Sequence, residues 1–465
     1  MIVNNKIRSK EFTEDFKNII FSMKKAILYI SFAYPPIGAV GSIRSAKITK
    51  YLYENGWIPH VVAGVPFSSP SAMNLQKEIP SHFVHHISFF DPMRFSHPKG
   101  IDHLSDNPLN PIINQFHEPT WKKVAKCLNN NRTIGNISKH FIPMSITRMP
   151  DRRFTWIKPA YKACMDILRQ ENIDLIFSSS SPPSCAIVAS MVQKKSDLPW
   201  IAEFRDLWSR NHVDIKTRLF SWIEEKYERR VLKNASALVT VSEPFRQELI
   251  DLHNKPAYVI YNGFDVKDFE NDVPLLKTFT ITYTGSIYKY LQDPSPLFKA
   301  IAILKERDPP IVKNLKVKFF GKGYEKLIDF LAKSFDIEDY VSFCGEVDCL
   351  SAITAQKESS LLLLLEWNDP SAKGVIPGKL FEYLASGRPI LAIGFPGAIY
   401  EMLKKTNSGI LLNDSEEIVK FLRKSIGLFH RDPDLGFRAN KREIKKFSRE
   451  SQTKILIRIF NEYIS

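Results

Sequence analysis

The chain has 465 residues, of which 44% are hydrophobic, and a formal net charge of +15. This length predicts two domains. No apolar run reaches the roughly 18 residues that a membrane-spanning helix needs, which argues against an integral membrane protein. The positive charge favours acidic partners such as phosphorylated substrates or anionic lipid, whereas no nucleic-acid-binding motif is recognisable, so we expect no nucleic acid as a partner.

The cysteines and histidines predict no metal site. The cysteines are odd in number and scattered, which predicts free thiols in a reducing cytoplasm: Cys127, Cys164, Cys185, Cys344 and Cys349. Six histidines gather in one region, but no pair is fixed on one helix face with carboxylate support: His82, His85, His86, His97, His103 and His117. No convincing acidic D-x-D motif occurs either, so we expect neither a metal nor another cofactor.

The first half opens as a β–loop–α–β unit. An apolar run at residues 26–32 predicts a strand, a helix is expected from Ser42, and a second strand follows, as in a Rossmann-like domain. The connecting loop carries Gly38 and Gly41, followed by Arg44, but it lacks the G-x-G-x-x-G fingerprint of dinucleotide-binding loops. A plain tight turn is the alternative for this loop.

Two stretches of the first half show no clear periodicity. Residues 1–24 are predicted to be a polar arm and not a signal peptide, because the basic residues follow the short apolar run. Residues 66–150 are rich in Pro, Ser, Asn and His and predict an irregular insertion that shapes an acceptor site or a lipid contact.

Polar residues follow two later strands of this half. The strand at residues 174–177 runs into the serine-rich stretch 178–184, and the strand at 199–204 runs into Arg205 and Asp206. Polar residues at the carboxyl ends of parallel strands lie where open α/β sheets bind ligands. The alternative is that Arg205 and Asp206 pair with each other as a structural bridge.

The alternation of strands and helices restarts in the second half. After a polar linker, the strand at residues 279–283 reaches Gly285 and Ser286, and later strands predict a second parallel sheet. The tail from Phe437 is predicted to be helical, with a basic stripe whose alternative is a solvated face: Arg438, Lys441, Lys445 and Arg449.

The stretch from Gly374 to Ile393 predicts a loop, a short helix and a buried strand. Gly378 opens the helix, whose free N–H groups suit a phosphate, and Lys379 adds a positive charge. Glu382 lies one turn further on, where it can accept hydrogen bonds from a ribose diol. An anion site beside a carboxylate suits a nucleotide diphosphate, although an ordinary solvent-facing helix is the alternative.

These residues carry a resemblance to GT-B glycosyltransferases of family 4. The stretch GKLFEYLASGRPILAI resembles their donor-nucleotide motif, and SSSSPPS with WIAEFRDLW resembles a pair that commonly contains SSPP and DFRDPW. Glu203 and Leu207 depart from that pair conservatively. The resemblance covers most of residues 25–425 and implies two doubly wound parallel-sheet domains facing a cleft, with the last helix returning to the first domain. The expected boundaries are 25–265 for the first domain, 266–277 for the linker, 278–436 for the donor domain and 437–465 for the basic helix.

The resemblance also implies a function. It predicts a retaining glycosyltransferase that moves a sugar from a nucleotide-diphosphate sugar to a glycan or lipid-linked acceptor of a surface polysaccharide, such as lipopolysaccharide or capsule. Such an enzyme is expected in the cytoplasm, bound peripherally to the anionic inner membrane face. The catalytic residues would be Arg205, Asp206 and Lys379, the donor would bind at Gly285, Ser286, Lys373, Gly378, Lys379, Leu380 and Glu382, and the acceptor-side loop would be Gly38, Gly41 and Arg44.

The sequence departs from the family in ways that keep two other functions open. Gly374 stands where the broader family often has a glutamate near the sugar, and Ser286 and Gln292 stand where many members have an Arg and a Lys. The loss at Gly374 supports a non-catalytic scaffold that binds nucleotide sugars. A GT-B nucleotide-sugar epimerase is the other alternative, but it needs a carboxylate and histidine set that we cannot assemble.

Overall fold

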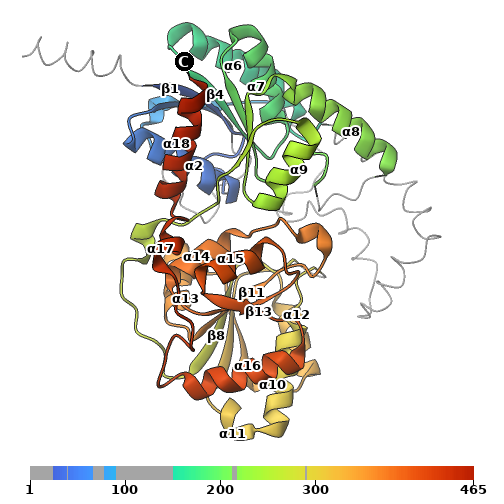
Figure 1. Cartoon of the computed structure of the whole chain (residues 1–465), viewed down its shortest axis with the longest axis vertical. Coiled ribbons are helices and arrows are strands. Elements are labelled where there is room, and N and C mark those ends of the chain that lie inside the picture. The colour runs from blue at the N-terminus through green and yellow to red at the C-terminus, as the bar shows by residue number, and fades with distance from the viewer. Residues whose placement is uncertain are drawn as a thin grey trace, which may run out of the picture.

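The computed structural model describes residues 25–38, 40–65, 78–90, 150–211, 217–288 and 291–464. These residues form two α/β domains, one above the other in Figure 1, that are joined by two crossings of the chain. The expected N-terminal arm and most of the expected insertion, residues 66–77 and 91–149, lie outside the described residues.

The first domain is built on a parallel sheet of seven strands in the order β3-β2-β1-β4-β5-β6-β7. Its central strands β1 and β4 are buried along their whole length, so their sequences are runs of small or apolar residues rather than alternating ones. The strands are β1 (Ala26–Ile30), β2 (Ile58–Gly64), β3 (Val84–Ile87), β4 (Leu175–Ser180), β5 (Trp200–Phe204), β6 (Ala237–Thr240) and β7 (Ala257–Val259). The described helices are α2 (Val40–Glu54), α6 (Ile157–Gln170), α7 (Ser184–Ser196), α8 (Arg218–Val231) and α9 (Glu243–His253).

The second domain has a parallel sheet of six strands in the order β10-β9-β8-β11-β12-β13. The central strand β11 consists of five leucines, all of them buried. The strands are β8 (Phe279–Thr284), β9 (Leu315–Phe320), β10 (Val341–Gly345), β11 (Leu361–Leu365), β12 (Ile390–Ile393) and β13 (Gly409–Leu411). The helices are α10 (Ser295–Arg307), α11 (Pro309–Val312), α12 (Glu325–Ser334), α13 (Cys349–Lys357), α14 (Gly378–Ser386), α15 (Ala398–Thr406), α16 (Ser415–Leu428) and α17 (Lys441–Lys445), and the last helix of the chain, α18 (Arg449–Tyr463), returns to the first domain.

The two crossings between the domains lie side by side. Phe264 on the way out and Ser448 on the way back form a parallel β-bridge, and the N–H of Arg449 donates to the Phe264 carbonyl at 2.8 Å. Helix α18 then packs against α2 (Figure 1), and Leu456 and Phe460 are buried in the first domain's core. The predicted fold class, two parallel-sheet domains with a last helix that returns to the first, is confirmed.

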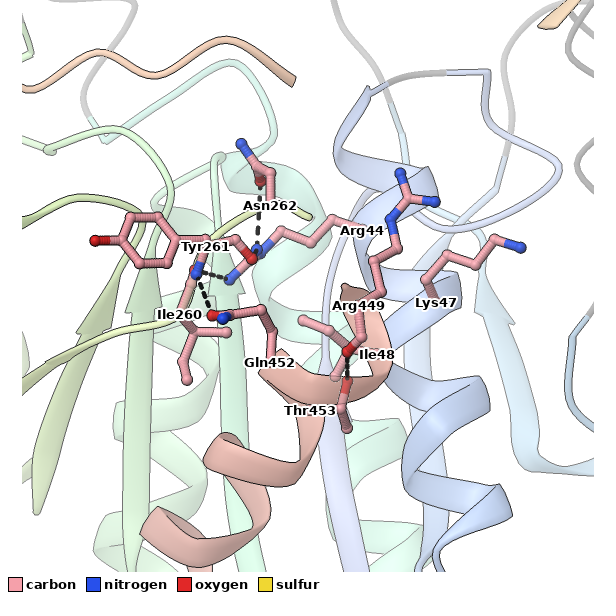
Figure 2. Close-up of a pocket in the computed structure, with 9 residues that line it drawn as sticks. All are labelled: Arg44, Lys47, Ile48, Ile260, Tyr261, Asn262, Arg449, Gln452 and Thr453. Carbon is pink, nitrogen blue, oxygen red and sulfur yellow. Dashed lines mark hydrogen bonds between the residues drawn. The ribbon is translucent and has the colours of Figure 1, made fainter. Parts of the chain in front are cut away.

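Asp265 stabilises the two chain crossings at Phe264 and Ser448, which we call the hinge. It does so because it forms ion pairs with cations from two helices. Its carboxylate lies 2.8 Å from Nζ of Lys47 in α2 and 3.1 Å from Nη1 of Arg449 in α18, and it also accepts from the Tyr51 hydroxyl. Burial opposes its ionisation, but these partners hold the pKa of Asp265 below its usual value. A small pocket lies beside this network (Figure 2), and its cationic lining residues Arg44, Lys47 and Arg449 are all ion-paired. We therefore assign the pocket to the hinge.

Two elements differ from the sequence-based expectations. The expected irregular insertion contributes the edge strand β3, which pairs with β2. The predicted helix from Phe437 begins only at Lys441, since residues 437–440 are not helical, and residues 446–448 divide it into two helices, α17 and α18. Arg438 pairs with Asp432 at 3.0 Å and Arg449 with Asp265, so the four predicted basic residues do not form one continuous helical face.

Candidate functional site

The carboxyl ends of two neighbouring strands and the amino end of one helix meet in the second domain. Strand β8 is followed by Gly285 and Ser286, and β11 is followed by Glu366. Helix α14 begins close to the Gly285 loop, since Lys379 of its first turn reaches that loop. The carboxyl ends of parallel strands are where open α/β sheets bind ligands.

Lys379 points from the first turn of α14 at the loop after β8. Its Nζ donates to the Tyr283 hydroxyl at 2.5 Å and lies 3.4 Å from the Ser286 carbonyl oxygen. A Cβ on Gly285 would lie 3.2 Å from that Nζ, so the missing side chain leaves room beside the ammonium. No carboxylate of the described residues forms an ion pair with Lys379 within 4.0 Å. The first turn of α14 therefore presents a positive charge that is free to pair with a ligand.

The start of α14 is also open at the backbone. Pro377 precedes the helix without a side-chain cap, and nothing lies within 4 Å of the position where a Cβ of Gly378 would be. Uncapped N–H groups and the helix dipole favour an anion at such an end. The N–H groups and Lys379 together make a site that suits a diphosphate.

Glu382 lies one turn further along α14 and is half-buried. The Nε2 of the buried Gln356 is 3.3 Å from Oε2 of Glu382 and 3.0 Å from the Thr284 hydroxyl, so Gln356 ties the carboxylate to the end of β8. Burial raises the pKa of Glu382, against hydrogen bonding by Gln356 and the charges of Arg449 and Lys379. The carboxylate is thus held in place beside the anion site.

Glu366 is a site residue that our sequence analysis missed. It is almost completely buried at the end of β11, and its Oε1 lies 3.4 Å from Nε2 of Gln292. Burial raises the pKa of Glu366 to about 7, although Lys379 pulls it down. Burial likewise lowers the pKa of Lys379 to about 8, although Glu366 and Glu382 pull it up. The signal that could have found Glu366 is its place directly after the all-leucine strand.

On the first domain's side, Arg205 follows β5 and packs against the amino end of α2. Its Nη2 donates to the Ser181 carbonyl at 2.8 Å and its Nε to the Ser180 carbonyl at 3.2 Å. A Cβ on Gly41 would lie 1.8 Å from Nη1 of Arg205, so this glycine makes room for the guanidinium. Asp206 is exposed, and no ion pair between Arg205 and Asp206 occurs in the described part of the chain.

Tyr288 is a residue of the second domain whose pKa is influenced by carboxylates of both domains. It is half exposed in the loop after β8, and its pKa is raised by partial burial and by the nearby carboxylates of Asp206 and Glu366. One of these carboxylates belongs to the first domain and the other to the second. The pKa of Tyr288 is therefore raised by one carboxylate from each domain.

Arg44 does not face the cleft as a free cation. Its guanidinium is buried, lies 2.6 Å from the Glu203 carboxylate, and donates to the carbonyls of Ile260 and Tyr261 at 2.8 Å each. Glu203 also accepts from the Ser179 hydroxyl. Arg44 thus has a structural role, because its hydrogen bonds join α2, β5 and the end of the first domain. Its expected place on the acceptor side stays a prediction. Gly38 lies in the turn before α2.

Leu380, Lys373 and Gly374 make contacts within the protein, and the donor-binding roles expected of Leu380 and Lys373 stay predictions. Leu380 is fully buried in the second domain's core. Lys373 pairs with Glu248 of α9 at 3.2 Å across the domain boundary. A Cβ on Gly374 would lie 2.4 Å from the ring of Phe245, also in α9. The space for a larger residue at Gly374 is therefore filled by the first domain.

Of the histidines that the sequence analysis considered as metal ligands, only some lie within the described residues. His82 lies in the 3-10 helix before β3, His85 and His86 lie in β3, and His86 Nδ1 is 3.1 Å from the Gly64 carbonyl. Within the described ranges, no group of three His, Cys, Asp or Glu side chains could hold a metal ion. His97, His103 and His117 lie outside the described residues.

Comparisons with known proteins agree with this geometry. Residues 128–268 match the family model of Glycosyltransferase Family 4, and residues 278–427 match that of Glycosyl transferases group 1. Protein CapJ of Staphylococcus aureus is 23% identical over 171 residues, which cover 36% of this chain and 42% of CapJ. The match thus spans less than half the length of that relative. No helix of the described residues is long and apolar enough to span a membrane.

Solved structures share the fold over most of the chain. A glycosyltransferase from Rickettsia africae has a TM-score of 0.58 at 15% identity and covers 95% of this chain and 99% of its own. Anabaena HepE in complex with UDP-glucose has a TM-score of 0.58 at 14% identity, covering 94% and 99%. The lipopolysaccharide outer core galactosyltransferase WaaB has a TM-score of 0.56 at 13% identity, with the same coverage. With a family match in each domain and this fold, the chain belongs to the GT-B glycosyltransferases of the family 4 and group 1 type.

Proposed function

We propose that the protein transfers a sugar from a nucleotide-diphosphate sugar to a glycan or lipid-linked acceptor of a surface polysaccharide. The observation that carries this proposal is Lys379, whose ammonium faces the Gly285 loop without a carboxylate partner among the described residues. A partly buried lysine ammonium beside an uncapped helix N-terminus is complementary to the negative charge of a diphosphate. Glu382, one turn away, is placed to accept hydrogen bonds from the ribose.

In the proposed reaction, the bond from the sugar C1 to the diphosphate oxygen breaks, a bond from C1 to the oxygen of an acceptor hydroxyl forms, and the hydroxyl proton passes to the departing diphosphate. Negative charge develops on the departing diphosphate, and Lys379 with the N–H groups of α14 would neutralise it. This positive charge comes from the protein, so we expect transfer without a metal. By family resemblance we expect the configuration at C1 to be retained. Arg205 and Asp206 would contact the acceptor from the first domain's side of the site.

The nature of donor and acceptor is supported by similar proteins. HepE was solved with UDP and with UDP-glucose, which supports a nucleotide-sugar donor for this chain. The similarity to CapJ and the shared fold with WaaB support an acceptor from capsule or lipopolysaccharide synthesis. We infer that the enzyme works in the cytoplasm, peripherally at the inner membrane face where lipid-linked acceptors are found.

One observation favours a second candidate, a scaffold that binds nucleotide sugars without turning them over. Phe245 fills the space at Gly374, so no side chain from that position can hold the donor sugar. Turnover distinguishes the two functions.

The test begins with a thermal-shift screen of UDP-, GDP- and other nucleotide sugars on the full chain. We expect at least one to raise the melting temperature, because a ligand that binds only the native state stabilises it. Release of nucleoside diphosphate from that donor by the purified protein alone, unchanged by EDTA, would support a metal-independent transferase. Binding without release would favour the scaffold, and loss of release with EDTA would reject metal independence. Stabilisation by none of the nucleotide sugars would contradict the proposal.

A further inference from the structure

Helix α8 buries two carboxylates beside Val231 and exposes a group of apolar side chains. Its inward face carries Glu224 and Glu228, which are 7% and 1% exposed, while Leu219 and Trp222 on its outward face are 63% and 55% exposed. Ile223 beside them is also exposed. Surface helices normally bury their apolar side and expose the charged one.

The inward carboxylate of Glu228 has a structural role. Glu228 accepts from the N–H of Ser209 at 2.9 Å and lies 3.1 Å from Nε2 of His253, and Tyr227 packs edge-on against Trp208. The helix is therefore fixed with this side inward. The outward position of its apolar residues follows from that anchoring, and packing of the described residues does not cover them.

The outward face of α8 is also basic. Arg218 lies before the apolar cluster, and Lys226, Arg229 and Arg230 follow it on exposed positions. The Nζ of Lys226 lies 3.7 Å from the centre of the Trp222 ring. The other carboxylate of the helix, Glu225, is ion-paired with Arg229 at 2.9 Å and Arg210 at 3.6 Å. This face thus offers three apolar side chains within a ring of positive charge.

We infer that this α8 face, made of Leu219, Trp222, Ile223, Lys226 and Arg230, docks on the surface of an anionic lipid bilayer. Bulky apolar residues with basic neighbours are the composition of helices that lie in the interfacial plane of a membrane. Tryptophan prefers the headgroup level, and lysine and arginine are attracted to anionic lipids. The charge of the face is opposite to that of the lipid, which selects a bilayer over a neutral protein groove.

The position of α8 indicates how docking would serve sugar transfer, a consequence that rests on the proposed function. The helix lies at the rim of the first domain (Figure 1) and begins at Arg218, a short segment after the site residue Asp206 at the end of β5. Docking through α8 would hold the first domain's side of the site close to the bilayer, where a lipid-linked acceptor resides.

The test is sedimentation of the full chain with phosphatidylcholine vesicles that contain or lack phosphatidylglycerol. We expect wild-type protein to sediment with the anionic vesicles at low salt and to be released by high salt, because salt screens the attraction between the basic side chains and the anionic lipid. Leu219→Ser/Trp222→Ser/Ile223→Ser should bind at least tenfold more weakly. Lys226→Glu/Arg230→Glu should lose the preference for anionic over neutral vesicles.

A matched control comes from α12, which exposes Phe330 between two basic residues. Lys326→Glu/Phe330→Ser/Lys333→Glu should sediment like the wild type. Binding of the α8 apolar variant at wild-type strength, or an equal loss in the α12 control, would overturn the inference. The inference would also be overturned if light scattering showed a dimer for the wild type and a monomer for the α8 apolar variant, because a second copy of the chain would then cover the α8 face.

Calorimetry with UDP keeps this inference separate from the proposed function. All of these variants should bind UDP like the wild type, since none of their positions lies in the donor site. Absence of UDP binding in the wild type would count against the proposed function alone, whereas normal UDP binding without vesicle binding would count against the α8 inference alone.

Discussion

The ammonium of Lys379 and the hydroxyl of Tyr283 are 2.5 Å apart, and the same ammonium lies 4.0 Å from the centre of the Tyr283 ring. Tyr283 in turn donates to the Ser286 carbonyl at 2.6 Å. One tyrosine from the end of β8 therefore links the cation of α14 to the loop that would contact the diphosphate.

Removing only the hydroxyl of Tyr283 should leave the ammonium of Lys379 less firmly positioned. Tyr283→Phe keeps the buried ring but deletes the oxygen that accepts from Lys379, a charged hydrogen bond worth about 1.5–3 kcal/mol. Because this hydroxyl holds the ammonium towards the loop that would contact the diphosphate, we expect UDP affinity to fall by about three- to tenfold, a part of that hydrogen-bond energy. Tyr340→Phe, at a half-buried tyrosine before β10, serves as a control. Unchanged UDP affinity in Tyr283→Phe would show that the hydroxyl does not position Lys379.

The pH dependence of donor binding should report the charge of Lys379. Its pKa is lowered by burial to about 8, so it is charged below that pH and loses its proton above it. Affinity for UDP-glucose, whose diphosphate diester does not titrate in this range, should therefore fall as pH rises through 8, by up to about tenfold per unit. Lys379→Arg, which stays charged, should flatten this profile.

Glu366 and Glu382 are the carboxylates that act on Lys379, and both raise its pKa. Glu366→Gln removes one of them, so the midpoint of the same titration should move to lower pH. A merely structural role of Glu366 would change the affinity without moving this midpoint. A midpoint that stays in place would contradict the coupling.

The sequence grouped donor-side residues that the structure brings together, because the signals are local, and their role in binding stays a prediction. Gly378, Lys379 and Glu382 lie within five residues of each other, and a helix of known start fixes their relative positions. Gly285 and Ser286 were found because a polar turn after an apolar strand marks the carboxyl edge of a parallel sheet. Glu366 follows the same rule, and the sequence contained enough information to include it.

Roles that depend on contacts between distant segments could not be predicted. Arg44 is 159 positions from Glu203, and nothing local shows that the fold buries them as a pair. Phe245 is far from Gly374 in the chain, so the sequence could not show that its ring fills the space beside this glycine. Helical spacing alone also could not show that Arg449 turns to the hinge carboxylate of Asp265.

The contact of Phe245 with Gly374 should make the domain boundary sensitive to a single methyl group. The Cβ of Gly374→Ala would lie 2.4 and 2.5 Å from two ring carbons of Phe245, and such overpacking costs about 1–3 kcal/mol. We expect a lower melting temperature, which Phe245→Leu should partly restore in the double variant. Gly427→Ala in α16, where no atom lies within 4 Å of the added Cβ, should not lower it. A melting temperature of Gly374→Ala equal to that of the wild type would contradict this domain contact.

Glu382 should bind the nucleoside part of the donor. Glu382→Ala removes a charge-assisted hydrogen bond of about 1.5–3 kcal/mol, so UDP or GDP affinity should fall about tenfold to a hundredfold. The fold should remain, because the Glu382 side chain is half-buried at the edge of the helix rather than in the core. Calorimetry measures the change, with Glu401→Ala on the exposed side of α15 as the control. Equal affinities for wild type and Glu382→Ala would show that the carboxylate does not contact the nucleotide.

The central claim is that the first turn of α14 binds the diphosphate of a nucleotide donor. Calorimetry of Lys379→Ala with UDP and with uridine tests it most directly, with GDP and guanosine in their place if the protein prefers guanine. The account predicts a loss of about tenfold or more for the diphosphate, the size of a charged hydrogen bond, and nearly unchanged affinity for the bare nucleoside. Equal losses for diphosphate and nucleoside, or no loss for either, would contradict it.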